Sequence, residues 1–369
     1  MDLNLTDDQQ LIRESAARFV SDAGRPEPGH RGFDRALWSQ MAEMGWLAAG
    51  ISEDLGGFGG PVETALIVEE LGRGGRAGAF LGAGVMGPQL LVATADAAAT
   101  EAVLPSVIAG ETILAAAVSE EGAAGNLAHV AASAARDGAA WRIDGAKSLV
   151  LVGDVADRLI VSARTAGEAD GISLFLVDSG VPGVTVQATP LVDGSGAATI
   201  RLDGAEGTLL GSEGEGAAAL TAMAEQTIAA IAAESVGIME AVAEITAEYF
   251  RSRKQFGMLL GQFQVLQHKL ADMAIDAEMA RATLLVALAA FEQADPALRA
   301  RRFAGAKAAS GEALRRVTEA GVQAHGGMGM TEEYPVGFYL QRMVVLDAVL
   351  GAPAVHLARC AASLATAGA

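Results

Sequence analysis

The sequence predicts an α+β fold that is mainly α, with an N-terminal helical domain, a middle antiparallel β domain and a C-terminal helical bundle. Three observations predict it. Apolar residues recur at helical spacing early in the chain, short Val/Ile/Leu runs separated by Gly and Asp follow, and long helical periodicity returns after Gly216. We place the domains at residues 1–112, 113–214 and 215–369.

The N-terminal domain begins with a helix that Thr6 caps and that continues to Val20, with two aspartates in its first turn facing the positive end of the helix dipole. Further helical segments are expected at residues 37–47 and 63–71, on either side of a Gly-rich turn at 56–60. These segments predict a small α domain.

The middle domain is predicted from short strands with no helices between them. The expected strands are Ile113–Val118, Trp141–Ile143, Arg158–Ala163, Ile172–Val177, Val184–Val186 and Thr199–Leu202. Regular short strands of this kind indicate an antiparallel sheet.

The C-terminal domain opens with a long apolar stripe at spacings of three and four residues. Its members are Ile228, Ile231, Ser235, Ile238, Val242, Ile245 and Tyr249. Such a stripe requires a helical partner, and four more helical segments follow: residues 262–294, 297–322, 338–350 and 354–364.

Composition excludes several classes of protein. The 369 residues are 51% hydrophobic, enough for two or three cores, and the net charge of −19 argues against a nucleic-acid partner, which needs clustered Lys and Arg. Cys360 is the only cysteine, so no intrachain disulfide can form. Because the first ten residues have neither a basic start nor an apolar run, we expect a cytoplasmic protein.

Two patterns suggest functions that their context does not support. The uncharged stretch 77–95 contains Gly and Pro and few large apolar residues, so we expect a buried helix and turn and no membrane association. Residues 82–87, GAGVMG, match the dinucleotide fingerprint in form, but no strand precedes them and Pro88 follows. No two histidines have metal-ligand spacing, so no metal site is expected.

Two other segments are more informative. Arg251–Gly257 (RSRKQFG) lies at the end of the long apolar helix. It is either a solvated basic helix end or a junction where the Arg253 guanidinium holds a diphosphate. The second interpretation arises because another helix starts soon after. Gln323–Met330 (QAHGGMGM) has three glycines at a helix end, either as a simple C-cap or to let the backbone approach a ligand.

Together, RKQFG, QFQVLQHKLADM and QAHGGMGMTEEYP, at these separations, resemble the acyl-CoA dehydrogenase family. The likeness covers essentially the whole chain, including LTDDQQLIRESAARFV at the start and GISLFLVD in the middle domain. Within the family, residues 346–360 (LDAVLGAPAVHLARC) and 147–167 resemble most the small subunit of bacterial pimeloyl-CoA dehydrogenase, and less closely subunits of bacterial sterol-side-chain heterotetramers.

The resemblance implies a C-terminal four-helix bundle and FAD bound between two subunits, where one protomer's bundle covers the adenosine and diphosphate of its neighbour's flavin. Arg253 is then expected to pair with the diphosphate. The adenine end would be lined by Gln255, Phe256, Leu260 and Phe263. From the opposite protomer, Gln323, Gly326 and Gly327 would meet the same diphosphate.

The resemblance also shows departures at the flavin ring. The family's Thr-Glu-Pro stretch reads Ser119-Glu120-Glu121 here, so the hydroxyl is kept on Ser119. Where the family places a Trp and a Thr against the ring, this chain has Leu149 and Leu151. Loss of the aromatic wall and of a hydroxyl weakens the placement of the ring.

The family's reaction removes a proton from the acyl Cα while hydride leaves Cβ for the flavin, so it needs a base and a polarised thioester carbonyl. The base of much of the family aligns with Leu350, directly before Gly351, and that of a second group aligns with Thr227. Neither side chain accepts a proton near neutral pH. The backbone N–H of Leu350, which in the family helps to hold the thioester carbonyl, is retained.

No catalytic residue is therefore assigned. Glu225, Glu234 and Asp347 lie near these positions as possible substitutes, with a solvated or capping role as the alternative for each.

The resemblance implies an FAD-dependent acyl-CoA dehydrogenase that oxidises an acyl-CoA thioester to the 2-enoyl-CoA. We expect this chain to be the subunit without the base in an oligomer with a Glu-bearing large subunit, and an electron-transfer flavoprotein to accept the electrons. Two alternatives remain: a non-catalytic acyl-CoA-binding or structural protein with the same fold, and a homo-oligomeric enzyme whose base has moved.

Overall fold

The computed structural model of the protein describes residues 4–26, 32–138, 140–165 and 171–367. The first ten residues and the segment 147–167, both used above, each extend beyond these ranges at one end. The described residues form two compact units. The helical unit lies within residues 1–30, 65–77 and 228–369, and the β unit within 31–64 and 78–227.

Two helices contribute to both units, α3 (Pro61–Arg73) and α6 (Gly216–Ser252). The predicted fold class, helical then β then helical along the chain, is confirmed by the order of the elements. The residue boundaries of the three domains stay a prediction.

The helical unit starts with α1 (Asp7–Ala23), and Thr6 caps this helix as predicted. The Thr6 side chain accepts from the N–H of Gln9, and the Gln9 side chain accepts from the N–H of Thr6, which makes a capping box. The later elements are β8 (Lys254–Gln255), β9 (Met258–Leu259), η4 (Leu260–Gln262), α7 (Gln264–Ala290), α8 (Pro296–His325), η5 (Gly326–Met330), α9 (Val336–Ala348) and α10 (Pro353–Ala367).

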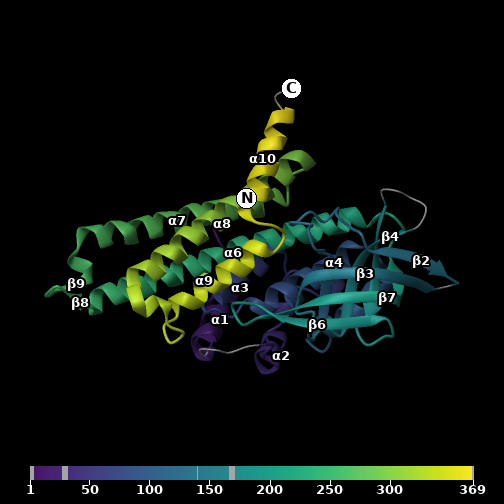
Figure 1. Ribbon diagram of the computed structural model, residues 1–369, viewed down its shortest axis with the longest axis horizontal. Coiled ribbons are helices and arrows are strands. Elements are labelled where there is room, and N and C mark those ends of the chain that lie inside the picture. Colours follow the sequence, from purple (N-terminus) through teal and green to yellow (C-terminus); the bar gives the residue numbers. More distant parts are fainter. Residues whose placement is uncertain (1–3, 27–31, 139, 166–170, 368–369) are drawn as a thin grey trace. The chain divides into compact units, whose positions relative to one another are not determined.

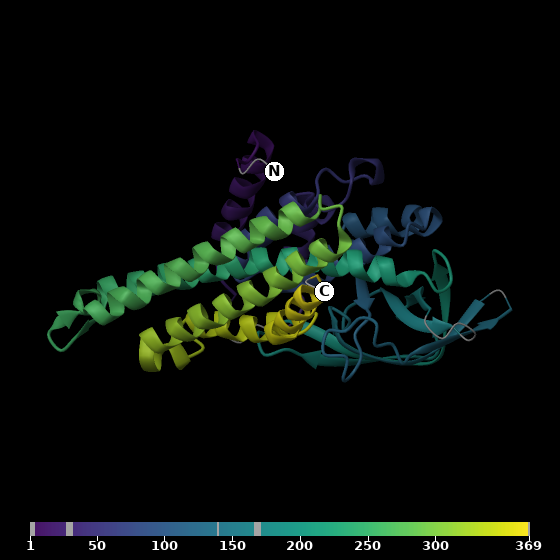
Figure 2. The ribbon, with the colours of Figure 1, turned by 90° about the horizontal axis from the view of Figure 1, so that it is seen from above.

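Long helices pack side by side in this unit, because the apolar stripe of α6 is buried against its neighbours (Figures 1 and 2). Ile231, Ile238 and Val242 are all but fully buried. A Cβ placed on Gly321 of α8 would lie 2.5 Å from a Val242 methyl, so glycine at 321 lets α8 approach α6 closely.

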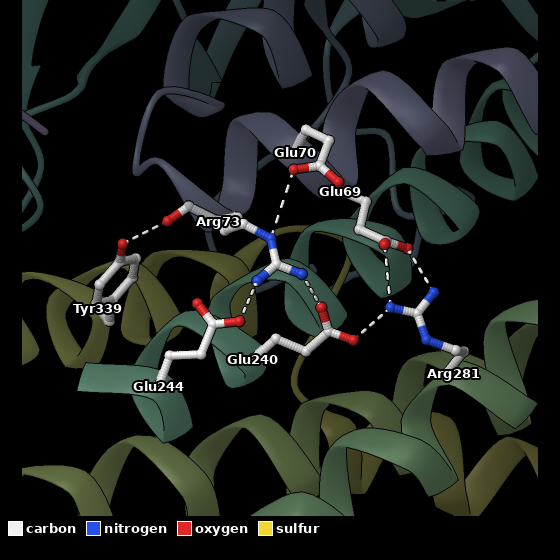
Figure 3. A network of polar contacts seen from close by, with 7 residues as sticks. All are labelled: Glu69, Glu70, Arg73, Glu240, Glu244, Arg281 and Tyr339. Atoms are coloured by element: carbon white, nitrogen blue, oxygen red, sulfur yellow. Dashed lines mark hydrogen bonds and ion pairs between the residues drawn. The ribbon is translucent and has the colours of Figure 1, made fainter. Parts of the chain in front are cut away.

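An ion-pair network ties α3 to α6, α7 and α9 (Figure 3). Arg73 of α3 pairs with Glu70, Glu240 and Glu244, and the hydroxyl of Tyr339 on α9 donates to the Arg73 carbonyl at 2.5 Å. Arg281 of α7 donates hydrogen bonds from two nitrogens to the Glu69 carboxylate, at 3.0 and 3.1 Å, and one to Glu240 at 2.5 Å.

The β unit holds a mixed sheet and several short helices. The helical elements are α2 (Arg35–Glu43), η1 (Trp46–Ala48), η2 (Glu53–Leu55), η3 (Phe80–Met86), α4 (Gly87–Ala93) and α5 (Ala97–Ile108). The strands are β1 (Leu114–Ala117), β2 (Ser133–Asp137), β3 (Ala140–Leu151), β4 (Arg158–Thr165), β5 (Ile172–Asp178), β6 (Val184–Pro190) and β7 (Gly196–Leu210).

The sheet corrects one detail of the prediction. Strands β3, β5, β6 and β7 pair antiparallel, but β4 pairs parallel with both β1 and β2. The hairpin β2–β3 lies between β1 and β4 in the sequence, and β2 was not predicted because its Ser, Ala, Arg and Asp residues form no apolar run. Strand order depends on such distant partners, which a local pattern does not encode.

The GAGVMG string forms no dinucleotide loop. It lies in η3, a π-helix that continues into α4, and Gly82 is required for packing: a Cβ there would lie 2.9 Å from the Leu151 Cβ. In the described part of the chain no single helix is long and apolar enough to cross a bilayer, although the bent pair α9 and α10 together meets that length and composition.

Candidate active site

The segment expected to hold the diphosphate and adenine is a hairpin at the end of α6. β8 and β9 pair through a turn at Phe256 and Gly257, both with positive φ, 52° and 79°. Arg253 and Gln255 are exposed, and within the described ranges the Arg253 guanidinium has no hydrogen-bond or ion-pair partner. Phe256 is 92% exposed and meets Phe263 edge to face, with ring centroids 6.4 Å apart.

The second expected segment ends α8. Gln323, Gly326 and Gly327 are exposed, and a Cβ on either glycine would meet nothing within 4 Å. Gly326 has a φ of 57°, whereas Gly327 has no positive φ, so neither crowding within the chain nor backbone conformation requires glycine at 327.

These two segments lie close together within one chain, because their helices are joined by an aromatic cluster. The His325 ring at the end of α8 lies 4.4 Å from the Tyr249 ring of α6 and 4.8 Å from the Tyr334 ring, between ring centroids. Tyr249 precedes Arg253 by about one helical turn. Each chain thus offers an exposed cation, an exposed aromatic ring and open glycine backbone, which fit an anionic dinucleotide, and the expected shared site would take these features from two protomers.

The residues expected at the flavin ring belong to the β unit, where the backbone is strained. Leu149 has a φ of 50° and lies within a bulge of β3 against β7, and Val152, just past the end of β3, has a φ of 53°. A left-handed backbone at such side chains costs about 1–3 kcal/mol each and persists only where the surroundings enforce it. Leu151 is 6% exposed and packs on Gly82, so the wall is aliphatic.

Ser119 is half-buried, and a buried ion pair fixes the residue after it. The Ser119 carbonyl accepts a hydrogen bond from the N–H of Ser148 at 2.9 Å. The Glu120 carboxylate accepts from the Lys147 Nζ at 2.5 Å and from two backbone N–H groups, at 2.7 and 3.1 Å. The Lys147 side chain is fully buried, and Nζ also donates to Ser162. Glu120 is therefore fully engaged as a structural carboxylate.

The two positions expected from the family resemblance to carry the base are built differently. Thr227 is completely buried, and its hydroxyl donates to the Met223 carbonyl at 2.7 Å. Leu350 is half-buried just past α9, with a φ of 58°. Its backbone N–H has no hydrogen-bond partner among the residues that the structure describes. Neither side chain is a proton acceptor.

All three substitute carboxylates are buried, and two of them are held in ion pairs, so the solvated or capping alternative does not describe these two. Glu234 is 1% exposed and binds Arg342 through both oxygens, at 2.6 and 3.0 Å. Asp347 is buried and paired with Arg315; burial raises the pKa of Asp347, and the Arg315 charge opposes that shift. Glu225 is also buried. Because Glu234 and Asp347 are held in ion pairs, these two carboxylates are structural groups.

Two residues near Leu350 were not identified from the sequence. Lys307 of α8 is 1% exposed, and its Nζ donates to the Leu346 carbonyl at 2.5 Å; burial lowers its pKa to about 8. His356 of α10 is 1% exposed, its Nε2 lies 2.9 Å from the Leu350 carbonyl oxygen, and burial lowers its pKa to about 4. The one sequence feature that could have indicated a buried lysine is Lys307 itself, a single lysine among the alanines of α8.

Other features of the described residues lie apart from this site. A cavity of about 480 Å³ in the β unit is lined by residues of η2, α4 and α5 and contains none of the expected cofactor or base residues. No three His, Cys, Asp or Glu side chains in the described part of the chain gather closely enough to hold a metal ion.

Three family profiles match the chain in succession. The N-terminal, middle and C-terminal domain profiles of acyl-CoA dehydrogenases match residues 6–111, 115–204 and 214–365. The chain belongs to the acyl-CoA dehydrogenase family, whose members are FAD-binding oxidoreductases.

Individual relatives agree with this assignment. The chain is 31% identical to benzylmalonyl-CoA dehydrogenase of Aromatoleum aromaticum, over 92% of this chain and 93% of that protein. The solved butyryl-CoA dehydrogenase of Megasphaera elsdenii has a TM-score of 0.91 at 26% identity, covering 99% of this chain and 100% of its own. A chain of the ChsE4-ChsE5 complex of Mycobacterium tuberculosis has a TM-score of 0.85 at 28% identity, covering 99% of both.

Proposed function

We propose that this chain is the subunit without the catalytic base in a heteromeric, FAD-dependent acyl-CoA dehydrogenase. One observation carries the proposal: Leu350 and Thr227 occupy the two positions where the family places its base, and the nearby Glu234 and Asp347 are held in ion pairs. A Glu-bearing large subunit supplies the base in this account. The likeness to a chain of the ChsE4-ChsE5 complex supports a paired enzyme. Closeness to the small subunit of pimeloyl-CoA dehydrogenase, expected from the sequence motifs, is part of this proposal.

FAD, when bound, supplies the hydride acceptor of the reaction. Arg253 would hold its diphosphate, and Gln323, Gly326 and Gly327 would meet the same group from another protomer. Gln255, Phe256, Leu260 and Phe263 would line the adenine end, and Ser119 would serve the ring. The exposure of Phe256 and the open space at Gly327 support a site that a second subunit completes.

The substrate is an acyl-CoA thioester and the product is its 2-enoyl-CoA. The N–H of Leu350, free of protein partners in the described residues, would donate to the thioester carbonyl oxygen and acidify the Cα–H. The partner's glutamate would take the Cα proton, and FAD, when bound, would supply the acceptor for the Cβ hydride. An electron-transfer flavoprotein removes the two electrons, and we place the enzyme in the cytoplasm.

The aliphatic pair Leu149 and Leu151 favours a second candidate, a non-catalytic acyl-CoA-binding or structural protein with the same fold. Flavin content separates the two. A colourless protein that ignores added FAD, even when purified with its partner, would establish the second candidate.

The proposal is tested by producing the chain with and without a Glu-bearing dehydrogenase encoded beside it. We expect acyl-CoA oxidation only from the pair, and loss of turnover with flavin retained when the partner's glutamate is changed to glutamine. Turnover by the purified chain alone would contradict the proposal.

A further inference from the structure

The backbone around Leu350 is held by side chains from two other helices. α9 ends at Ala348, and the carbonyl at Leu346 in its last turn accepts from the Lys307 Nζ on α8 at 2.5 Å. The carbonyl of Leu350 accepts from His356 on α10 at 2.9 Å. Both donor side chains are 1% exposed, so packing fixes their positions.

The hydrogen bond to Leu350 determines the tautomer of His356. Nε2 faces a carbonyl oxygen, which only accepts, so Nε2 carries the proton. Burial keeps the ring neutral near neutral pH, because it lowers the pKa of His356 to about 4. Nδ1 is then a bare acceptor, and this buried atom has no partner in the described residues. The neutral ring therefore carries its one N–H proton on Nε2, and this N–H donates a hydrogen bond to the Leu350 carbonyl oxygen.

The backbone at Leu350 is left-handed and carries an N–H donor without a partner in the described residues. Leu350 adopts a φ of 58°, which leucine rarely does, and Gly351 follows with a φ of 98°. Val349 and Gly351 donate their N–H groups to carbonyls within the last turn of α9, whereas the N–H of Leu350 donates to no described residue. Fixing the carbonyl of Leu350 on one side thus leaves the N–H of the same residue free.

We propose that His356 is a positioning residue for the substrate carbonyl: its hydrogen bond to the Leu350 carbonyl holds the left-handed turn in which the Leu350 N–H is presented to the thioester oxygen. This inference rests on the proposed function, because it presumes that the chain binds an acyl-CoA. His356 does not touch the substrate and makes or breaks no covalent bond. It acts through the backbone of Leu350.

The test measures polarisation of a bound thioester and needs no turnover. The full-length, FAD-loaded chain is titrated with trans-2-butenoyl-CoA and trans-2-octenoyl-CoA labelled with carbon-13 at the carbonyl, and the carbonyl stretch is followed by infrared difference spectroscopy. A donor on the oxygen moves this band to lower frequency. Variants are His356→Ala, His356→Gln, whose amide offers a donor at similar reach, and Leu357→Ala as a control at an exposed site of the same helix.

We expect the band to shift in the wild type, in His356→Gln and in Leu357→Ala. His356→Ala should lose the shift and bind about tenfold more weakly, as one hydrogen bond is lost. A full shift in His356→Ala would overturn the positioning role. A wild type that binds the thioester with an unshifted band would overturn the positioning role alone, whereas absence of thioester binding would remove the proposed function and this inference together.

Discussion

At the scale of single residues, Leu350 combines features that rarely occur together. It has a branched side chain, a φ of 58° and a backbone N–H without a partner in the described residues. Such a conformation costs about 1–3 kcal/mol and persists only where neighbours enforce it. Lys307 and His356 supply that enforcement. The backbone at the expected base position is therefore supported by buried side chains although leucine occupies it.

A glutamate at this position is expected to restore chemistry. In the FAD-loaded chain without its partner, Leu350→Glu should raise the rate of acyl-CoA dehydrogenation by about 100-fold or more, the usual contribution of a positioned general base. Leu350→Gln is the matched control, since it has the same shape without a titrating group. Equal dehydrogenation rates in the two variants would show that a carboxylate at position 350 does not act as a base in this pocket.

Arg253 is the residue on which FAD affinity should depend most. Arg253→Ala removes charge-assisted hydrogen bonds to a diphosphate, each worth about 1.5–3 kcal/mol, so the dissociation constant of FAD should rise at least about tenfold by fluorescence titration. Arg251, two positions earlier and also exposed, pairs with Glu248 and with no other acidic residue that the structure describes, and Arg251→Ala should leave the affinity unchanged. Similar losses in both variants would point to a general charge effect.

His356 should make stability depend on pH in a defined direction. Burial lowers its pKa in the folded state from 6.5 to about 4, so its contribution is complete above the unfolded-state pKa and is lost as the pH falls toward the folded-state value. The unfolding free energy of the wild type, relative to His356→Gln, should drop by about 1 kcal/mol between about pH 7.5 and about pH 5.5. Chemical denaturation at the two pH values measures it, and a constant difference would contradict it.

At the scale of elements, local patterns predicted most helices and strands, because capping and periodicity are local. Thr6 begins α1 as expected, and the stripe through Ile238 is the buried face of α6. The parallel pairing of β4 was missed because it joins strands distant in sequence. His356 was missed for a similar reason: its function depends on reaching a backbone carbonyl, and a sequence does not reveal which carbonyl lies within reach.

The same limit applies to charge pairs. Glu234 was considered as a base from its position in the sequence, and only its pairing with Arg342 in the fold assigns it a structural role. By contrast, departures from a family motif are local, so the sequence alone led to the prediction that Leu350 and Thr227 occupy the base positions, and this stays a prediction. The assignment of Arg253, Gln323 and the other cofactor residues stays a prediction.

The network in Figure 3 should contribute more to stability than an exposed pair of similar geometry. Arg281→Met leaves Glu69 buried without its bidentate partner and should lower the free energy of unfolding by about 2 kcal/mol. Arg316 holds Asp276 at 2.6 and 3.0 Å but is 57% exposed, so Arg316→Met should cost less than about 1 kcal/mol. Urea denaturation of the two variants compares them, and equal losses would contradict the importance of burial.

At the scale of the whole molecule, the chain has the fold of an acyl-CoA dehydrogenase. We propose that it departs from the family at the base and at the wall of the flavin ring. The exposed Phe256 and the unexplained glycine at 327 lie on the face where a second subunit would complete a cofactor site. A subunit that holds cofactor and substrate while its partner supplies the base accounts for the proposed absence of a base and for the turn at Leu350, whereas the aliphatic pair Leu149 and Leu151 favours the non-catalytic alternative.

Exchange of the substrate's Cα hydrogen tests the central claim most directly, because it reports proton removal without requiring oxidation. A saturated acyl-CoA is incubated in heavy water with the FAD-loaded chain, with its Glu-bearing partner present or absent, and deuterium at Cα is measured by mass spectrometry. We predict exchange at the background rate with the chain alone and rapid exchange with the pair. Rapid exchange by the chain alone, abolished by Glu225→Gln, Glu234→Gln or Asp347→Asn, would show that the chain carries its own base and would contradict the account.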